Sequence, residues 1–466
     1  MATHTANEDS RLSLWRRVRE YAVPPSMIET ATARRTAGDW AGACAAARVD
    51  VDLDLRSLAR THGRELTSRI RADLRHLAPD LLRWHMPRIA PDGLLRPGLT
   101  LSLARYATGD DGRGRRPGPV HLVVRTPPAW AEGGQRMSLA LWDGDMLRAC
   151  APQHPHPRPG ARFRLDLHRH LWDATRAGEL RVRAGADAAA ASGQAPDAPG
   201  ELLPPGRHCA VDRWADEARI VLRDTGRSAG AVAVRLGAGH RLLLRIADAG
   251  EGPAAVRIER AAERTGGSVP PVLPHAATHV LPDLELLRAG TVDAGRLHPS
   301  VATALVPGHV PSSAPRPHIP QGRPQFVRCR GAQHRIGLVD GVLTPLDHDP
   351  DEIRREELLA ELTGTPLPCL RAVDLAHRRP DCLEGVRERL DHGDIAGALD
   401  VVEHLLGPGA RLRSGPLRDE LEAAAHRRLT YGLYRSGLSG PAPGRIPPNK
   451  PRPGDARTHP RQAGLR

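Results

Sequence analysis

The chain has 466 residues, a formal net charge of +13, and many glycines (46) and prolines (44) but only two phenylalanines. This length exceeds what one hydrophobic core usually serves, so it predicts two or three domains. The single lysine, Lys450, argues against Walker A nucleotide binding, protein-kinase phosphotransfer and Schiff-base catalysis, which all require one.

The positive charge is consistent with a nucleic-acid partner, but its distribution weakens that argument. Residues 436–466 carry five arginines and Lys450 against one acid, Asp455. We expect this segment to be a disordered basic tail, which would hold over a third of the excess charge.

Apolar runs and cysteines bear on the location of the protein. No stretch approaches the roughly 20 apolar residues that span a bilayer, and the first residues lack a signal-peptide core. The six cysteines form no C-x-x-C pair, which favours reduced thiols. We therefore expect a cytoplasmic protein with no membrane partner.

Residues 1–95 predict a helical region, with the strongest helical pattern over 26–86. Apolar residues recur there at spacings of three and four, which is typical of a helix with one buried face. Residues 96–262 change to short alternating runs and predict a β-rich domain with a flexible insertion near 184–206. The expected strands are 99–106, 119–126, 137–144, 162–168, 218–224, 230–237, 240–248 and 254–259.

Residues 263–324 form a mixed segment with two short helical patterns, near 282–290 and 298–305, and a proline-rich linker at 307–324. Residues 325–435 predict a β-meander followed by a helical domain. Asp340-Gly341 is a strong hairpin signal. Asp349 followed by Pro350 predicts a capped helix start.

A short motif occurs twice. Gly38-Asp39-Trp40-Ala41-Gly42-Ala43 is matched by Gly393-Asp394-Ile395-Ala396-Gly397-Ala398, and each copy precedes an amphipathic helix. The motif resembles the turn of tetratricopeptide-type helical hairpins, which implies two closely packed helices. The 34-residue tandem period of that family is missing, so an ordinary αα-hairpin is the favoured interpretation.

Two motifs suggest hydrolytic chemistry. Gly226-Arg227-Ser228-Ala229-Gly230 fits the G-x-S-x-G nucleophile elbow, which requires a strand before it and a helix after it. The sequence after Ser228 predicts more strand, so a hairpin loop is favoured. Asp224-Thr225-Gly226 resembles an aspartic-protease turn, but it occurs once and a turn aspartate is favoured.

Two groups contain metal-ligand residue types. Cys150, His154, His156, His168 and His170 lie close in the sequence, without a spacing typical of zinc sites. Cys329, His334, Asp347, His348 and Asp349 surround the expected meander, where Asp349 is already explained by helix capping. The favoured interpretation of both groups is that they bind no metal, and we expect no cofactor.

Arginines give the first helical region a basic character. Arg69, Arg71, Arg75, Arg83 and Arg88, with Trp84 and His85, are suited to phosphate contact. The pattern spreads them around the helix, and the acids Asp73, Asp80 and Glu65 interrupt them, so a solvated face is favoured. The tail supplies further candidate contacts for nucleic acid, namely Arg445, Lys450, Arg452, Arg457 and Arg461.

These patterns together predict an α+β protein with helical ends around a β-rich centre. We expect a non-catalytic adaptor that binds another protein through its helical hairpins, with Trp40 and Tyr431 as candidate contact residues. The first alternative is a nucleic-acid-associated protein that uses the arginine-rich helices and the tail. A hydrolase that uses Ser228 is the third.

Overall fold

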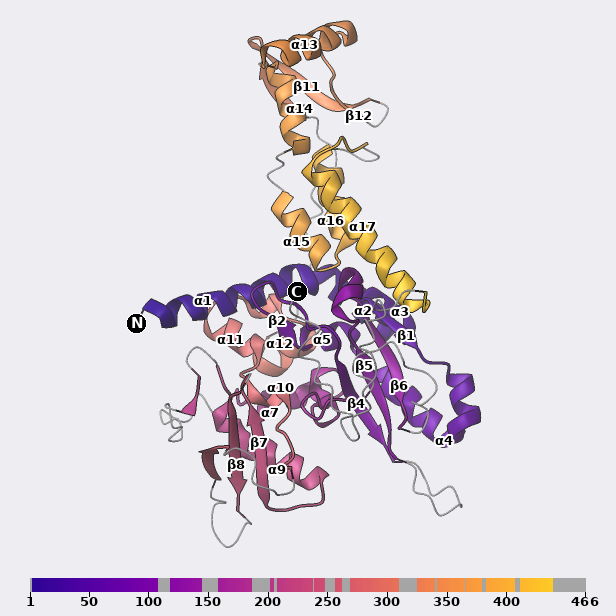
Figure 1. Cartoon of the computed structure of the whole chain (residues 1–466), viewed down its shortest axis with the longest axis vertical. Coiled ribbons are helices and arrows are strands. Elements are labelled where there is room, and N and C mark those ends of the chain that lie inside the picture. The colour runs from indigo at the N-terminus through magenta and orange to yellow at the C-terminus, as the bar shows by residue number, and fades with distance from the viewer. Residues whose placement is uncertain are drawn as a thin grey trace, which may run out of the picture. The chain divides into compact units, whose positions relative to one another are not determined.

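The computed structural model describes residues 2–107, 118–144, 158–186, 202–204, 208–237, 239–247, 256–261, 269–309, 325–339, 342–364, 366–378, 383–406 and 411–438. The architecture is α+β, with helices at both ends of the chain and sheets in its centre (Figure 1). The chain divides into two units. The first unit holds the described residues up to Ser312 except Ala131–Gln135, and the second holds Ala131–Gln135 and the described residues from Ser313 to Gly440.

The first unit begins with helices, as the sequence predicts. They are α1 (Ala2–Arg17), the short π-helix η1 (Val18–Ala22), α2 (Pro25–Thr36), α3 (Trp40–Ala46), α4 (Leu55–His76) and α5 (Pro79–Trp84). In α4, Leu66, Ile70 and Leu74 are buried at four-residue spacing, which explains why this face packs inward. Asp54 begins the helix by accepting a hydrogen bond from the Arg56 amide at 2.9 Å.

A strand interrupts this helical region, so the prediction of helix throughout 26–86 was wrong at one place. Val49–Asp52 forms β1, which pairs in parallel with β6. The four residues alternate valine and aspartate, and this period of two suits a strand. The full sheet has the order β1-β6-β5-β4, with β4 (Thr100–Tyr106), β5 (Val120–Arg125) and β6 (Met137–Trp142) antiparallel.

A second sheet follows, made of β7 (Gly230–Arg235), β8 (Arg241–Ile246) and β9 (Val256–Arg260) in sequential antiparallel order. The strand expected at 218–224 is instead the end of helix α9 (Val211–Asp224). Trp214, Ala218 and Val221 are buried in α9 at helical spacing and pack in a core with this sheet. A short window within that helix reads as a strand because isoleucine and valine are adjacent there.

The strand expected at 162–168 was also wrong, because the segment forms the 3-10 turn η4 (Leu165–Leu167). The indole of Trp172 donates to the Leu165 carbonyl at 3.0 Å, so that carbonyl is bound within the turn region instead of in a sheet ladder.

Short elements complete the unit: β2 (Arg88–Ile89), β3 (Leu94–Leu95), η2 (Ala129–Ala131), η5 (Arg169–Leu171), η6 (Ala177–Glu179), α7 (Leu180–Arg183), α10 (His275–Thr278), α11 (Pro282–Arg288), η8 (Ala294–Arg296) and α12 (Pro299–Leu305). Helices α11 and α12 confirm the two helical patterns of the mixed segment.

The second unit contains the predicted meander and helical domain. Its elements are η3 (Gly133–Gln135), β10 (Gln325–Cys329), β11 (Ala332–Val339), β12 (Val342–Pro345), α13 (Pro350–Thr363), α14 (Pro368–Arg378), α15 (Leu383–Asp391), α16 (Ile395–Leu406) and α17 (Pro416–Arg435). Val339 pairs with Val342, which confirms the two-residue hairpin between β11 and β12. The Asp349 side chain accepts from the Asp351 amide at 2.8 Å and Pro350 opens α13, as predicted.

The repeated Gly-Asp motif has the same local structure in both copies. Gly38 and Gly393 have positive φ (80° and 78°), a conformation that favours glycine. Asp39 and Asp394 then each accept a hydrogen bond from the amide three residues later. A Cβ on Gly42 would overlap the Asp39 carboxylate. Both copies therefore encode an αα-turn, between α2 and α3 and between α15 and α16.

Three expected segments cannot be followed in full. Most of the insertion at 184–206, most of the linker at 307–324 and nearly all of the tail at 436–466 lie outside the described residues. Among the helices that are described, none is long and apolar enough to cross a membrane.

The first Gly-Asp turn gives a direct test of this local code. Replacing Gly42 with alanine places a methyl group where the Asp39 carboxylate caps α3, so the capping hydrogen bond is lost. We expect Gly42→Ala to lower the free energy of unfolding by about 1–2 kcal/mol in chemical denaturation. The matched variant Gly178→Ala, where a Cβ meets nothing within 4 Å, should change it by less than about 0.5 kcal/mol. Equal effects of the two variants would contradict the proposed cap geometry.

Candidate functional site

A cluster of cysteine and histidine side chains lies in the second unit. Cys329 is the last residue of β10, His348 lies between β12 and α13, and Cys369 is the second residue of α14. One ligand atom of each side chain lies within 4.8 Å of the other two. Both cysteines are fully buried.

A second histidine adjoins this cluster. The rings of His334 and His348 stack with centroids 4.3 Å apart and planes 11° from parallel. His348 Nδ1 faces the Glu352 carboxylate at 3.5 Å. His334 Nδ1 and His348 Nε2 are buried and have no hydrogen-bond partner. We call Cys329, His334, His348 and Cys369 the Cys/His cluster.

Sequence reasoning found part of this cluster. It grouped Cys329, His334 and His348, but it missed Cys369, which only the fold of α14 brings beside the meander. The aspartates of that group lie elsewhere: Asp347 pairs with Arg335 at 2.7 Å and Asp349 caps α13. Burial and the neighbouring Cys329 raise the pKa of Cys369 to about 12.

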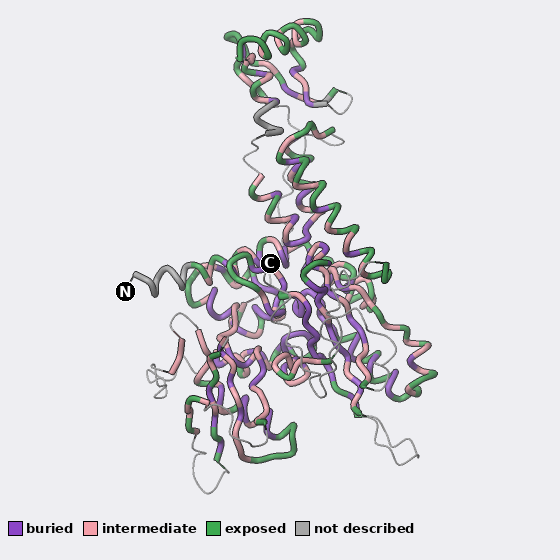
Figure 2. Tube along the Cα trace, in the orientation of Figure 1, coloured by how far each residue is buried: buried purple, intermediate pink, exposed green. Residues whose placement is uncertain are grey.

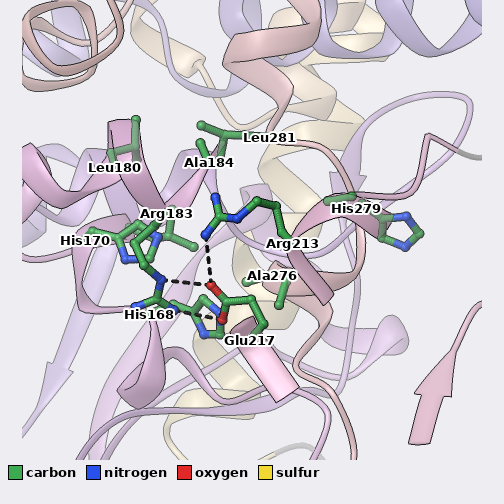
Figure 3. A pocket seen from close by; sticks show the side chains of 13 residues that line it. His168, His170, Leu180, Arg183, Ala184, Arg213, Glu217, Ala276, His279 and Leu281 are labelled. Atoms are coloured by element: carbon green, nitrogen blue, oxygen red, sulfur yellow. Dashed lines mark hydrogen bonds and ion pairs between the residues drawn. The ribbon is translucent and has the colours of Figure 1, made fainter. Parts of the chain in front are cut away.

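A small polar pocket lies in the first unit (Figure 3). Arg183 donates to Glu217 at 2.8 and 2.9 Å, and Arg213 lies 3.6 Å from the same carboxylate. His168 Nε2 lies 2.9 Å from Glu217, while its Nδ1 lies 3.1 Å from the Arg164 carbonyl. Both ring nitrogens of His168 therefore face hydrogen-bond acceptors.

The electrostatics of the pocket are those of a buried ion-pair network. Burial raises the pKa of Glu217, but the hydrogen bonds and positive charges of His168 and Arg183 outweigh it and bring the pKa to about 2. Burial and the same positive neighbours hold the pKa of His170 well below its usual range. The cavity of about 30 Å³ has room for one or two waters.

Of the first predicted metal group, His168 and His170 are described. His168 lies between the 3-10 turns η4 and η5, and His170 lies within η5. His168 is already bound to Glu217. Cys150, His154 and His156 lie outside the described residues.

The two hydrolytic motifs lie in a turn that has the opposite order to a nucleophile elbow. Helix α9 precedes Ser228 and strand β7 follows it. Ser228 is exposed, and no described histidine lies within hydrogen-bonding distance of it. Asp224 forms ion pairs with Arg164 at 3.0 Å and Arg105 at 3.5 Å, as expected for a structural turn residue.

Exposed apolar side chains gather in the second unit. Among the described residues, ten of the fourteen exposed large hydrophobic residues belong to it, although it is the smaller unit. In α17, Leu429 and Leu433 are 67% and 46% exposed and lie one helical turn apart. They lie opposite the buried residues of that helix, Leu417, Ala424 and Tyr431.

The candidate protein-contact residues are less accessible than expected. Tyr431 is buried, and Trp40 is half-buried against the core of the first unit. Exposed leucines of the second unit lie elsewhere: Leu429 and Leu433 are in α17, and Leu358, Leu359 and Leu362 are in α13. No residue of α13 is buried (Figure 2).

The arginines of α4 form a clearer surface than the sequence indicated. Of the acids expected to interrupt it, Asp73 and Asp80 are buried and Glu65 is exposed. Arg83 and Trp84 are also buried, which removes them as phosphate contacts. Arg64, Arg71 and Arg75 are exposed and lie within a narrow arc of the helix. None of these three arginines makes an ion pair or hydrogen bond within the described part of the chain.

The other basic residues that the sequence suggested for phosphate contact add little to this exposed surface. Arg69 lies over the Tyr106 ring at 5.4 Å, and Arg88 is held by the Arg83 and Gly93 carbonyls. The tail residues Arg445, Lys450, Arg452, Arg457 and Arg461 lie outside the described residues.

Comparison with protein-family models, curated proteins and solved structures finds no match to this chain.

The Glu217 network predicts a specific pH dependence. The pKa of this carboxyl is lowered from 4.5 to about 2 in the folded protein, so its stabilisation is complete above about pH 5 and is lost as the pH falls toward about 2. Glu217→Gln should therefore lower the free energy of unfolding by about 3 kcal/mol at neutral pH. The difference from the native protein should vanish as the pH approaches about 2.

Chemical denaturation at several pH values measures this difference. The matched variant is Asp216→Asn, in an exposed ion pair on the same helix, and its effect should stay below about 0.5 kcal/mol. A Glu217→Gln effect that does not change with pH would mean that the carboxylate charge is not what stabilises the fold.

Proposed function

We propose that this protein is a non-catalytic interaction protein that binds a partner protein through the helices of its second unit. The observation that carries the proposal is the concentration of exposed large hydrophobic residues in that unit. Clustered exposed apolar side chains on a folded surface are typical of interaction sites.

The α17 ridge, which we define as Ala425, Leu429 and Leu433, is the best-formed part of this surface. Its residues recur every four positions and so lie on one side of the helix. Such a ridge fits an amphipathic helix of a partner, whose apolar side chains would pack along it.

A charged residue beside the ridge indicates which kind of partner helix would fit it. Arg428 is exposed next to Leu429 and has no ion pair or hydrogen bond within the described residues. A carboxylate on the partner helix would complement it and favour the correct register. The expected occupant is therefore an amphipathic helix with an acidic flank.

A paired substitution tests the ridge. We expect Leu429→Gln with Leu433→Gln to weaken partner binding at least about tenfold, because each buried leucine anchor contributes on the order of 1 kcal/mol or more. The matched control is Val182→Gln, an equally exposed apolar residue of the first unit, which is 71% exposed. It should leave binding unchanged.

The measurement combines site-specific photo-crosslinking at position 425, which both variants leave free for the probe, with quantitative recovery of the crosslinked chain from nuclease-treated lysate. Support requires a stoichiometric partner that crosslinks at position 425 and is lost in the double variant alone. Light scattering of the purified protein identifies the alternative occupant, a second copy of this chain. If the double variant and Val182→Gln recover equal amounts of the crosslinked partner, the ridge is excluded as the binding surface.

A second candidate function is phosphate-backbone binding through the α4 arginines, and their lack of acidic partners favours it. Arg64, Arg71 and Arg75 extend over about 16 Å of helix. One nucleic-acid strand presents several phosphates over that length, at about 3.4 Å per charge. Because these arginines form no ion pair within the described residues, no existing ion pair has to break when they bind phosphates.

Salt-dependent binding to a short DNA duplex tests this candidate. Replacing Arg64, Arg71 and Arg75 with glutamine should weaken binding and reduce the slope of log K against log salt by about 3. The control replaces Arg176, Arg219 and Arg245, which change the net charge equally but already pair with Glu179, Asp216 and Glu259. A native protein that does not bind, or equal losses in both triple variants, would rule out the α4 surface as the site.

A further inference from the structure

We propose that the Cys/His cluster binds a zinc ion, with Cys329, His348 and Cys369 as ligands and His334 as the fourth. None of the observations that support this site depends on the proposed partner binding.

The ligand atoms are close enough to share one ion. Zinc binds cysteine sulfur at about 2.3 Å and histidine nitrogen at about 2.0–2.1 Å in a tetrahedron, which places ligand atoms about 3.5–3.8 Å apart. The atoms of Cys329, His348 and Cys369 already lie within 4.8 Å of one another. Small side-chain rotations would complete the geometry.

Two buried nitrogens lack a partner at this place. Most buried polar atoms in folded proteins form a hydrogen bond, so an unpaired one requires an explanation. His334 Nδ1 and His348 Nε2 are both buried and unpaired. The other nitrogen of His348 faces the Glu352 carboxylate, an arrangement that orients metal-bound histidines. A zinc ion would bind both free nitrogens, once His334 tilts away from its stack on His348.

The charge of the site fits a buried divalent ion. Two cysteine thiols would each release a proton on binding, and the two resulting thiolates with two neutral imidazoles would balance the two positive charges of zinc. A neutral centre avoids the cost of burying a net charge. Thiolate and imidazole ligands favour zinc over magnesium or calcium, which prefer oxygen.

The module around the cluster has little apolar core of its own. Among the residues from 325 to 373 whose side chains the structure describes, only Ile336, Leu343 and Val373 belong to the buried core of the second unit. Helix α13 has no buried residue, and it is joined to the β10–β11 turn through ion pairs of Arg330 with Glu352 and Glu356. Small modules of this kind commonly depend on a bound metal or a disulfide.

Metal analysis of the purified full chain, prepared under reducing conditions with zinc, tests the proposal. We expect about one zinc per chain, a value reduced at least tenfold in Cys329→Ser and in Cys369→Ser. The matched control is Cys44→Ala, which removes a buried thiol of the first unit and should retain the metal. Zinc retained by both cluster variants would overturn the site.

Cobalt substitution of the native chain keeps the test valid if the variants do not fold. After chelation and addition of Co²⁺, two thiolate ligands should produce sulfur-to-cobalt charge-transfer absorption together with the intense visible bands of a tetrahedral site. Absence of both signals from correctly folded protein overturns the proposal. A Cys329–Cys369 disulfide in freshly prepared, unreduced protein, found by mass spectrometry, would also overturn it.

His334→Ala tests the fourth ligand. We expect its zinc affinity to fall at least about tenfold, with a change in the visible cobalt bands. The matched variant Gln333→Ala, at the exposed neighbouring position, should keep the native affinity. An unchanged affinity in His334→Ala would remove this histidine from the ligand set.

Discussion

The fully buried carboxylate of Asp283 is the constraint on which the first unit depends. It accepts from Arg19 at 3.1 Å and from the Trp84 indole at 2.7 Å, and His85 lies 3.6 Å away. Burial alone would raise the pKa of Asp283, but these donors and positive charges lower it. Because a buried charge without its partners costs several kcal/mol, η1, α5 and α11 must meet for this unit to form.

The same principle governs two other buried carboxylates of the first unit. Glu217 is bound by Arg183 and His168, and Asp73 by the Tyr106 hydroxyl at 2.6 Å and by Arg169. In each case a neighbouring cation balances the charge of the carboxylate. Arg64, Arg71 and Arg75 of α4 differ, because they are exposed and form no ion pair within the described residues.

Features encoded by neighbouring residues were predictable from the sequence. The Gly38-Asp39 and Gly393-Asp394 turns, the Asp349 cap and the β11–β12 hairpin each depend on a few adjacent side chains. Errors arose where tertiary contacts decided the outcome. Residues 218–224 contain β-formers but belong to α9, since Trp214, Ala218 and Val221 bury one helical face. The pairing of Val49–Asp52 with β6 depends on a strand far along the chain.

The candidate sites show the same division. Cys329, His334 and His348 are close in sequence and were recognised as a group, but the approach of Cys369 depends on how α14 packs on the meander. Leu429 fits the apolar period of α17 but is exposed, because Leu417, Ala424 and Tyr431 form the buried side. No sequence pattern separates an apolar residue that faces a core from one that faces a partner.

The two unusual features of the second unit are physically connected. Its exposed leucines and its unpaired buried histidine nitrogens are both consistent with a core too small to organise the module alone. Helix α14 begins at the Cys/His cluster and contacts α17, which carries the exposed ridge. A metal that fixes the start of α14 would restrict the motion of α17 before any partner arrives. Since a preordered helix loses less entropy on binding, such a centre would strengthen association without contacting the partner.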